Sequence, residues 1–296
     1  MVYDEIARNR TKSFWLIVLF SIFVIWACYY IGIASGIGGG PGIFLGFFIS
    51  LIMSLLSYYS GSSLLLTSVG AREADPNQYP ELVHVVEEMK LSSGLPMPKV
   101  YVIPDPSPNA FATGRDPDHA VLAVNEGLLN LLNREELQGV IAHEMSHIKN
   151  RDILYATVVA VLLGMLILLS RFFTRFSLFG GGRRRSDDNG GGGWLFLVGI
   201  ALAILAPILG QLIQMAISRQ REYLADASGA LISRNPIGLA NALRKIANVQ
   251  IPSNTTNGAV APLYFMKPIN VRTLFSTHPP IEERISRLEQ MGYVKG

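Results

Sequence analysis

The chain has 296 residues, half of them apolar, and a formal net charge of +3 at pH 7. Its positive mean hydropathy is higher than a soluble domain requires. So small a net charge, without interleaved basic and aromatic residues, argues against nucleic acid as a partner. The single cysteine, Cys28, excludes an intrachain disulfide, which is consistent with a domain that faces the cytosol.

The N-terminal part of the chain is dominated by an uncharged run. No charged residue occurs in the 59 positions of 13–71, and a domain of this size could not bury such a run. The glycine-rich segment 32–42 divides it with a composition that breaks helices. We therefore predict a cytosolic N-terminus (1–12) and then two transmembrane helices within 13–71, at about 14–33 and 42–59. The first is too long for a cleaved signal peptide, so we expect it to stay as an anchor.

Residues 72–152 are predicted to form the first half of a polar domain. The segment 79–90 has apolar residues at helical spacing and ends at Ser-Ser-Gly-Leu-Pro, which predicts a helix that stops there. Three β-rich runs follow, bounded by Pro, Asp and Gly: 99–104, 109–115 and 119–125. Asn133 and Glu136 then form the pattern of a capping box, which opens another helix.

That helix carries the sequence VIAHEMSHIKNRD at 140–152, in which His143 and His147 bracket Glu144. Positions i and i+4 share one face of a helix, so both imidazoles can reach one metal ion, with Glu144 beside it. Catalytic zinc takes three protein ligands and keeps one position for water. The pattern therefore predicts a catalytic metal site to which another segment supplies the third ligand.

The chain then becomes apolar again over residues 153–218. Residues 153–170 are uncharged, and a second uncharged run has its apolar part at 194–217. As helices both are long enough to cross a bilayer, so we predict a membrane hairpin, with a buried helical hairpin as the alternative. The loop between them holds five arginines, which is unusual for a segment expected outside the cytosol.

Four spans place the N-terminus and both polar blocks on the same side of the membrane. Basic residues gather near the predicted membrane boundaries on that side: Arg8, Arg10, Lys12, Arg72, Lys149, Arg151, Arg219 and Arg221. Because short flanking segments rich in Lys and Arg usually stay in the cytoplasm, we predict a multi-pass membrane protein whose polar domain faces the cytoplasm.

The second polar block, 219–296, is expected to complete the metal site. Glu222 and Asp226 lie one turn apart on one face of a predicted helix. We predict that Glu222 is the third ligand and that Asp226 accepts the N–H of a ligating histidine, which fixes its tautomer. A surface glutamate beside a salt-bridged aspartate is the alternative. A hairpin would bring His147 and Glu222 to a similar height above the bilayer, since each lies five or six residues from a predicted span.

Four segments together resemble the HtpX group of membrane metalloproteases, part of a wider class that includes the CAAX prenyl protease Ste24 and the mitochondrial protease Oma1. They are NAFATGR (109–115), GVIAHEMSHIKNRD (139–152), SRQREYLADASGA (218–230) and STHPPIEERI (276–285). The resemblance covers nearly the whole chain. It implies a predominantly α membrane protein of the cell (inner) membrane, with four transmembrane helices, an α+β gluzincin-like protease domain carrying a small β-sheet, and one Zn²⁺ per chain.

The resemblance also implies roles for residues outside the ligand set. His278 matches a downstream histidine that donates to the tetrahedral oxyanion, although it could equally cap the last helix. Arg284 either anchors Asp226 or substrate, or is a solvated surface residue. Four residues match a strand whose free edge binds an extended peptide, with an internal strand as the alternative: Asn109, Ala110, Phe111 and Ala112.

The sequence thus predicts a zinc endopeptidase in which Glu144 takes a proton from the attacking water. The resemblance implies that its substrates are misfolded or damaged membrane and membrane-associated proteins, under stress and in cooperation with other membrane proteases; no oligomeric state is predicted. One alternative is a CAAX-type protease of prenylated proteins, although four spans are too few to enclose a large intramembrane chamber. The other is a non-catalytic zinc-binding adaptor, although structural zinc usually has four protein ligands, often Cys.

Overall fold

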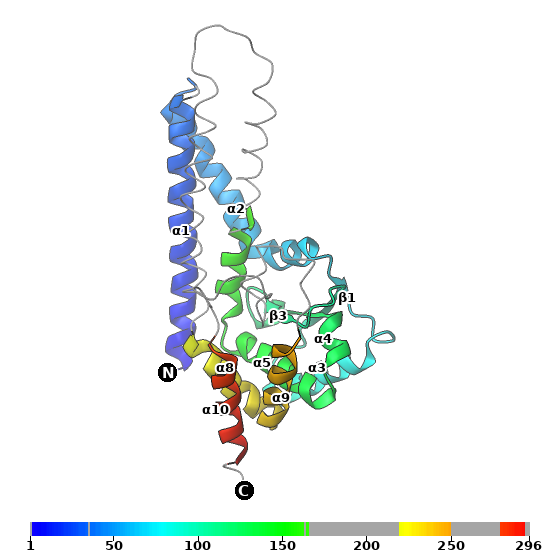
Figure 1. The fold of residues 1–296 in the computed structure, drawn as a ribbon. Helices are drawn as coiled ribbons and strands as arrows, with labels where there is room; N and C mark the ends of the chain where they lie inside the picture. Colours follow the sequence, from blue (N-terminus) through cyan, green and yellow to red (C-terminus); the bar gives the residue numbers. More distant parts are fainter. Residues whose placement is uncertain (1, 35, 163, 166–218, 250–278, 294–296) are drawn as a thin grey trace.

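The computed structural model describes residues 2–34, 36–162, 164–165, 219–249 and 279–293. Two long helices, α1 (Val2–Ala34) and α2 (Gly39–Ser68), lie side by side and run in opposite directions (Figure 1). The end of α2 leads into a mixed domain of strands and helices. In the described part, these two helices are long and apolar enough to cross a membrane. Large apolar side chains stay exposed along both, including Trp15, Trp26 and Phe44, as expected for surfaces that contact lipid.

The helix α2 is longer than the predicted span 42–59, because it begins at Gly39 and continues through Ser68. Gly38 precedes it with a φ of 99°, a conformation that favours glycine. Two glycines allow α2 to lie directly against α1: a Cβ atom at Gly42 or Gly46 would collide with the backbone of Cys28 or Ile25. The glycine-rich segment therefore serves both the turn and the helix contact, and only its middle part, between Ala34 and Gly39, interrupts the helices.

The domain contains one mixed sheet in the order β1-β2-β4-β3. The strand β1 (Arg72–Glu73) pairs antiparallel with β2 (Lys99–Ile103), which pairs parallel with β4 (Val121–Asn125). The strand β3 (Ala110–Thr113) pairs antiparallel with β4 and is, like β1, a terminal strand of the sheet among the described residues. The small sheet confirms the sequence prediction, while β1 and the short helices η1 (Pro117–His119) and α4 (Glu126–Leu131) were not predicted.

The two faces of the sheet pack against different layers, as the alternation of side chains along a strand requires. One face, with residues such as Leu122 and Val124, meets the helices α3 (Pro80–Ser93) and α5 (Arg134–Lys149). The other face, with Phe111 and Ala123, packs against the end of α2 and against Ala160 and Val161. The sheet thus lies between the domain's own helices and the helices that lead into the membrane.

A further apolar cluster attaches α1 to the helix Ile153–Leu162, which rises beside it (Figure 1). Leu16 and Phe20 of α1 belong to it together with Tyr155 and Val158. Since Leu16 and Phe20 lie in the apolar part of α1, the helix that starts at Ile153 enters the same apolar layer. The rest of the predicted hairpin, 153–170 and 194–217, lies largely outside the described residues, so the four-span arrangement stays a prediction.

Helices form the described part of the second polar block, as predicted for the segment around Glu222 and Asp226. They are α8 (Arg219–Ser233), α9 (Pro236–Ala247) and α10 (Ile281–Tyr293). Together with α5 they form a helical layer whose buried apolar residues belong to the same cluster as α3 and one face of the sheet. The described structure is therefore mostly helical with a small mixed sheet.

Candidate metal centre

The helix α5 carries the two histidines, and local interactions fix where it begins. The predicted capping box is present: Asn133 Oδ1 accepts the Glu136 N–H at 3.0 Å, and Glu136 Oε2 accepts the Asn133 N–H at 2.9 Å. Lys245 of α9 adds a 2.7 Å ion pair to Glu136. These contacts set the start of the helix and so the direction in which His143 and His147 point.

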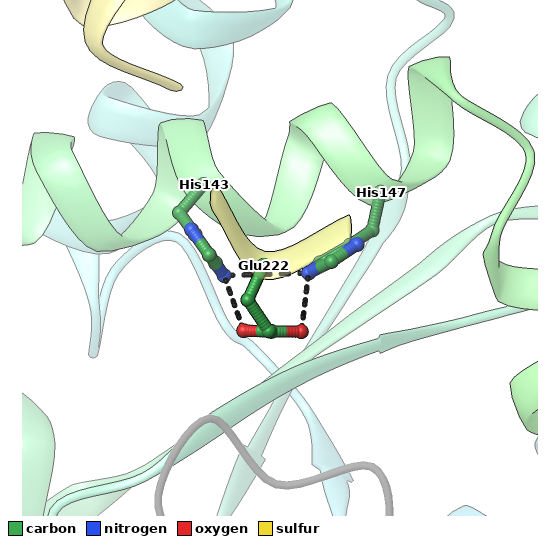
Figure 2. Close-up of side chains that lie close together, drawn as sticks. All are labelled: His143, His147 and Glu222. Atoms are coloured by element: carbon green, nitrogen blue, oxygen red, sulfur yellow. Dashed lines mark hydrogen bonds and ion pairs between the residues drawn. The ribbon is translucent and has the colours of Figure 1, made fainter. Parts of the chain in front are cut away.

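Figure 2 shows His143, His147 and Glu222 converging on one position between α5 and α8. The Nε2 atoms of the two histidines are 3.3 Å apart. The Glu222 carboxylate lies 3.7 Å from His143 Nε2 and 3.8 Å from His147 Nε2. Ligand atoms around a tetrahedral zinc, at its usual bond lengths, are about 3.4 Å apart. The spacing and the donor types of these three residues therefore fit a zinc ion.

The surroundings of the three donors also favour a positive charge. Burial would lower the pKa of His147, but the hydrogen bond to Asp152 and the charges of Glu222 and Glu144 outweigh it and raise this pKa to about 9. Excess negative charge of this kind stabilises a cation, whether a proton or a metal ion. The electrostatics and the donor geometry thus both favour a bound cation between His143, His147 and Glu222.

The helix α8 reaches the histidines because it crosses α5 at very short range. At Gly229 an added Cβ atom would lie 2.9 Å from the backbone N and Cα of His143. Next to this contact, Ser146 Oγ donates to the carbonyl of His143 at 2.6 Å and lies 3.2 Å from the carbonyl oxygen of Ala225. Glycine and serine at these positions therefore place Glu222 of α8 over the two imidazoles.

Replacing Gly229 by Ala is expected to destabilise the protein by about 1–3 kcal/mol, because the methyl group pushes α8 away from α5 in a packed layer. The same displacement moves Glu222 from the histidines, so zinc affinity should also fall. Thermal unfolding of the metal-free protein and chelator competition measure the two effects. Leu231→Ala, at an exposed position of the same helix, serves as the control; unchanged stability and zinc affinity in Gly229→Ala would contradict the close-contact argument.

The structure places Asp226 and Arg284 behind His143. The Nδ1 of His143 lies 3.0 Å from Asp226 Oδ1. Arg284 of α10 donates twice to the Asp226 carboxylate, at 2.8 and 2.7 Å. Burial of Asp226 favours its neutral form, but the charge and hydrogen bonds of Arg284, together with His143, lower its pKa to about 2. Arg284 is 1% exposed, so the solvated surface alternative does not apply to it.

Sequence reasoning missed the corresponding partner of His147. The Nδ1 of His147 lies 3.3 Å from Asp152 Oδ2, and Arg221 Nη1 lies 3.8 Å from Asp152 Oδ1. Each histidine therefore turns Nε2 to the shared donor position and Nδ1 to a carboxylate that has an arginine behind it. The signal in the sequence was an acidic residue five positions after His147, directly before an apolar run.

Glu144 lies beside the donors and is held by the sheet. It is 3% exposed, and its Oε2 accepts the backbone N–H of Ala112 at 2.9 Å. Burial raises the pKa of its carboxyl above the ordinary value, although the neighbouring histidines and the Ala112 N–H act in the opposite direction. A raised pKa brings a carboxylate closer to the range in which it accepts a proton efficiently near neutral pH.

The four residues predicted to bind substrate are all buried. Three of them form β3, and Asn109 precedes it, with its Oδ1 accepting the Ala110 N–H at 3.1 Å. His278 lies outside the described residues, so both of its interpretations stay open.

Two histidines one turn apart, a glutamate from a second helix and a buried glutamate between the histidines define the class of HExxH metallopeptidases. The model of peptidase family M48 matches residues 76–292. A "Protease HtpX homolog" of Caldanaerobacter subterraneus subsp. tengcongensis is 50% identical and aligns over 98% of both chains. One from Dictyoglomus turgidum is 43% identical over 98% of this chain and 95% of its own.

The chain belongs to peptidase family M48 and is a membrane zinc protease. This confirms the resemblance inferred from the four sequence segments. A solved relative in fold is Ste24p of S. mikatae, with a TM-score of 0.50 and 17% identity, covering 97% of this chain and 67% of that one. At this identity the likeness concerns the fold.

Proposed function

We propose that the protein is a zinc endopeptidase of the cell (inner) membrane that cleaves misfolded or damaged membrane and membrane-associated proteins at the cytoplasmic face. One observation carries the proposal: the donor cluster, formed by His143, His147 and Glu222, lies close to the point where the chain enters the apolar part of the membrane helices. His147 is five residues from Asp152, after which the chain enters the helix packed against Leu16 and Phe20. A site at this height favours substrates that are already held at the membrane.

In this proposal His143, His147 and Glu222 hold one zinc ion, and Glu144 is the general base. Bound zinc would lower the pKa of water and polarise the scissile carbonyl. Glu144 takes the proton from the attacking water and delivers it to the leaving amine. The Ala112 N–H holds one oxygen of Glu144, so the carboxylate keeps its place while the proton moves. Asp226 keeps His143 in the tautomer whose Nε2 is free for a metal.

We further propose that β3 aligns the substrate as an extended strand. Asn125 donates its N–H to the carbonyl of Asn109, and the antiparallel pattern then directs the N–H and C=O groups of Ala110 and Ala112 away from β4. Asn109 and Glu144 accept from the two N–H groups. The Ala110 carbonyl, on the same edge as Glu144, is the acceptor proposed for a substrate N–H. The terminal place of β3 in the described sheet supports this assignment.

The test is metal-dependent cleavage of an unfolded membrane protein by the full-length chain in detergent. Chelation should abolish cleavage, and one equivalent of Zn²⁺ per chain should restore it. Two comparisons distinguish the alternatives. Cleavage of a prenylated peptide but not of the unfolded protein would favour the CAAX-type protease. A protein that binds one zinc per chain and cleaves neither substrate would favour the non-catalytic adaptor.

A further inference from the structure

Asp152 occupies a junction between the metal site and the membrane. It is 7% exposed and lies between the end of α5 and the helix Ile153–Leu162. Its backbone N–H donates to the carbonyl of His147 at 3.0 Å, and its own carbonyl accepts from Ala156 at 3.3 Å. The residue thus ends the turn after α5 and occupies the N-cap position of the next helix.

The Asp152 carboxylate faces two groups that have different functions. On one side His147 Nδ1 lies 3.3 Å from Oδ2. On the other side Arg221 Nη1 lies 3.8 Å from Oδ1. Arg221 directly precedes Glu222 in α8, and its guanidinium lies 5.8 Å from the ring centroid of Tyr155. Arg221 therefore links α8, which carries the proposed third ligand Glu222, to the start of the helix Ile153–Leu162.

The partners of His143 show what this arrangement does. His143 has Asp226 behind it, and Asp226 is held by Arg284. Histidines that bind metals usually donate their second N–H to a carboxylate, which fixes the tautomer and the ring orientation. The pair Asp152 and Arg221 repeats this arrangement for His147. The two pairs differ in location, because the Asp152 pair lies at the membrane junction.

We propose that Asp152 is a positioning residue for His147 and that Arg221 holds Asp152, so that one ligand of the metal is oriented from the start of a membrane helix. This inference rests on the proposed function, since it requires a metal at the donor cluster. It makes the geometry of the site depend on how the helix Ile153–Leu162 lies against α1 and α8. The simpler alternative is that Asp152 only caps that helix.

The variant Asp152→Ser separates the two roles. Serine is also a good N-cap residue, but its side chain is too short to take the place of the carboxylate beside His147. We expect zinc affinity of the full-length protein in detergent, measured by chelator competition, to fall by about 10- to 100-fold. The melting temperature of the metal-free protein should change little. The absorption bands of bound Co²⁺ should shift, because the orientation of one ligand changes.

Further variants keep the test decisive. Asp116→Ser is the matched control, since Asp116 is also an N-cap residue whose carboxylate contacts an imidazole, that of His119 at 2.6 Å, away from the donor cluster. It should leave zinc affinity unchanged. Arg221→Gln should weaken zinc binding, but by less than Asp152→Ser, and should add little to it in the double variant. If Asp152→Ser does not fold, Asp152→Asn keeps the size and the capping group without the charge and should lose about 10-fold.

Unchanged zinc affinity in the folded Asp152 variants would overturn the inference and leave the proposed function intact. A lower melting temperature with unchanged zinc affinity would have the same meaning and would assign Asp152 to helix capping. Failure of the wild-type protein to bind zinc would instead contradict the proposed function. The outcomes of the two proposals are therefore distinct.

Discussion

Replacing Glu144 by Gln is expected to lower kcat by about 100- to 10,000-fold while zinc stays bound. Glutamine keeps the size of the side chain, and its amide oxygen can still accept the Ala112 N–H that holds Glu144 in place. It cannot accept a proton from water. The three proposed ligands, His143, His147 and Glu222, are unchanged, so the loss should appear in kcat with one zinc per chain retained.

Two other glutamates are controls for this experiment. Glu135→Gln changes an exposed residue of the same helix and should leave kcat unchanged. Glu222→Gln should lose zinc affinity, because a neutral amide is a weaker ligand than a carboxylate. Cleavage by zinc-loaded Glu144→Gln within a few-fold of the wild type would contradict the general-base assignment. Loss of zinc from that variant would instead indicate that Glu144 belongs to the ligand set.

The parts of the site that the sequence predicts are those with short-range signals. The spacing of His143 and His147 on one helix requires only helical geometry, and the capping box of α5 requires only Asn133 and Glu136. Glu222 could be proposed because an acid one turn from Asp226 suits a ligand and its neighbour. Local periodicity therefore supplied the donor types and the helix faces on which they lie.

The partners of these residues depend on contacts between helices that are distant in sequence. Asp226 was expected to serve a ligating histidine, but which one depends on how α8 crosses α5 at Gly229. Whether Arg284 anchors Asp226 or lies solvated at the surface could not be predicted, since the two residues are 58 positions apart in the sequence. Asp152 was missed because an acid beside an apolar run is ordinary at a membrane boundary. Its approach to His147 depends on the turn at Arg151, whose φ is 55°.

The helix α2 continues past Tyr59, where the predicted span ends, to Ser68. The span was predicted from the length that a bilayer requires, which does not say where the helix itself ends. Tertiary packing accommodates a glycine in the continuation: an added Cβ atom at Gly61 would lie 2.9 Å from a methyl group of Thr157. Glycine therefore serves close helix packing there. Likewise, the place of β3 at one end of the sheet follows from strand pairing, which short-range patterns do not specify.

Replacing Arg284 by Met is expected to destabilise the protein by about 3–5 kcal/mol. The arginine is nearly fully buried, and its two hydrogen bonds to Asp226 offset the cost of burying that carboxylate. Methionine fills much of the same space but leaves Asp226 without its cation. Thermal unfolding of the metal-free protein measures the effect, with Arg287→Met as the control, because Arg287 lies on the same helix with half of its side chain exposed.

A second replacement separates stability from positioning. In the double variant Asp226→Leu, Arg284→Met both charges of this buried pair are removed, so the double variant should be more stable than Arg284→Met alone. Its zinc affinity should nevertheless stay low, because His143 has lost the carboxylate at its Nδ1. Recovery of zinc affinity together with stability would show that Asp226 acts only through the fold. Recovery of stability alone supports the separate role of Asp226 in orienting His143, for which Arg284 supplies the compensating charge.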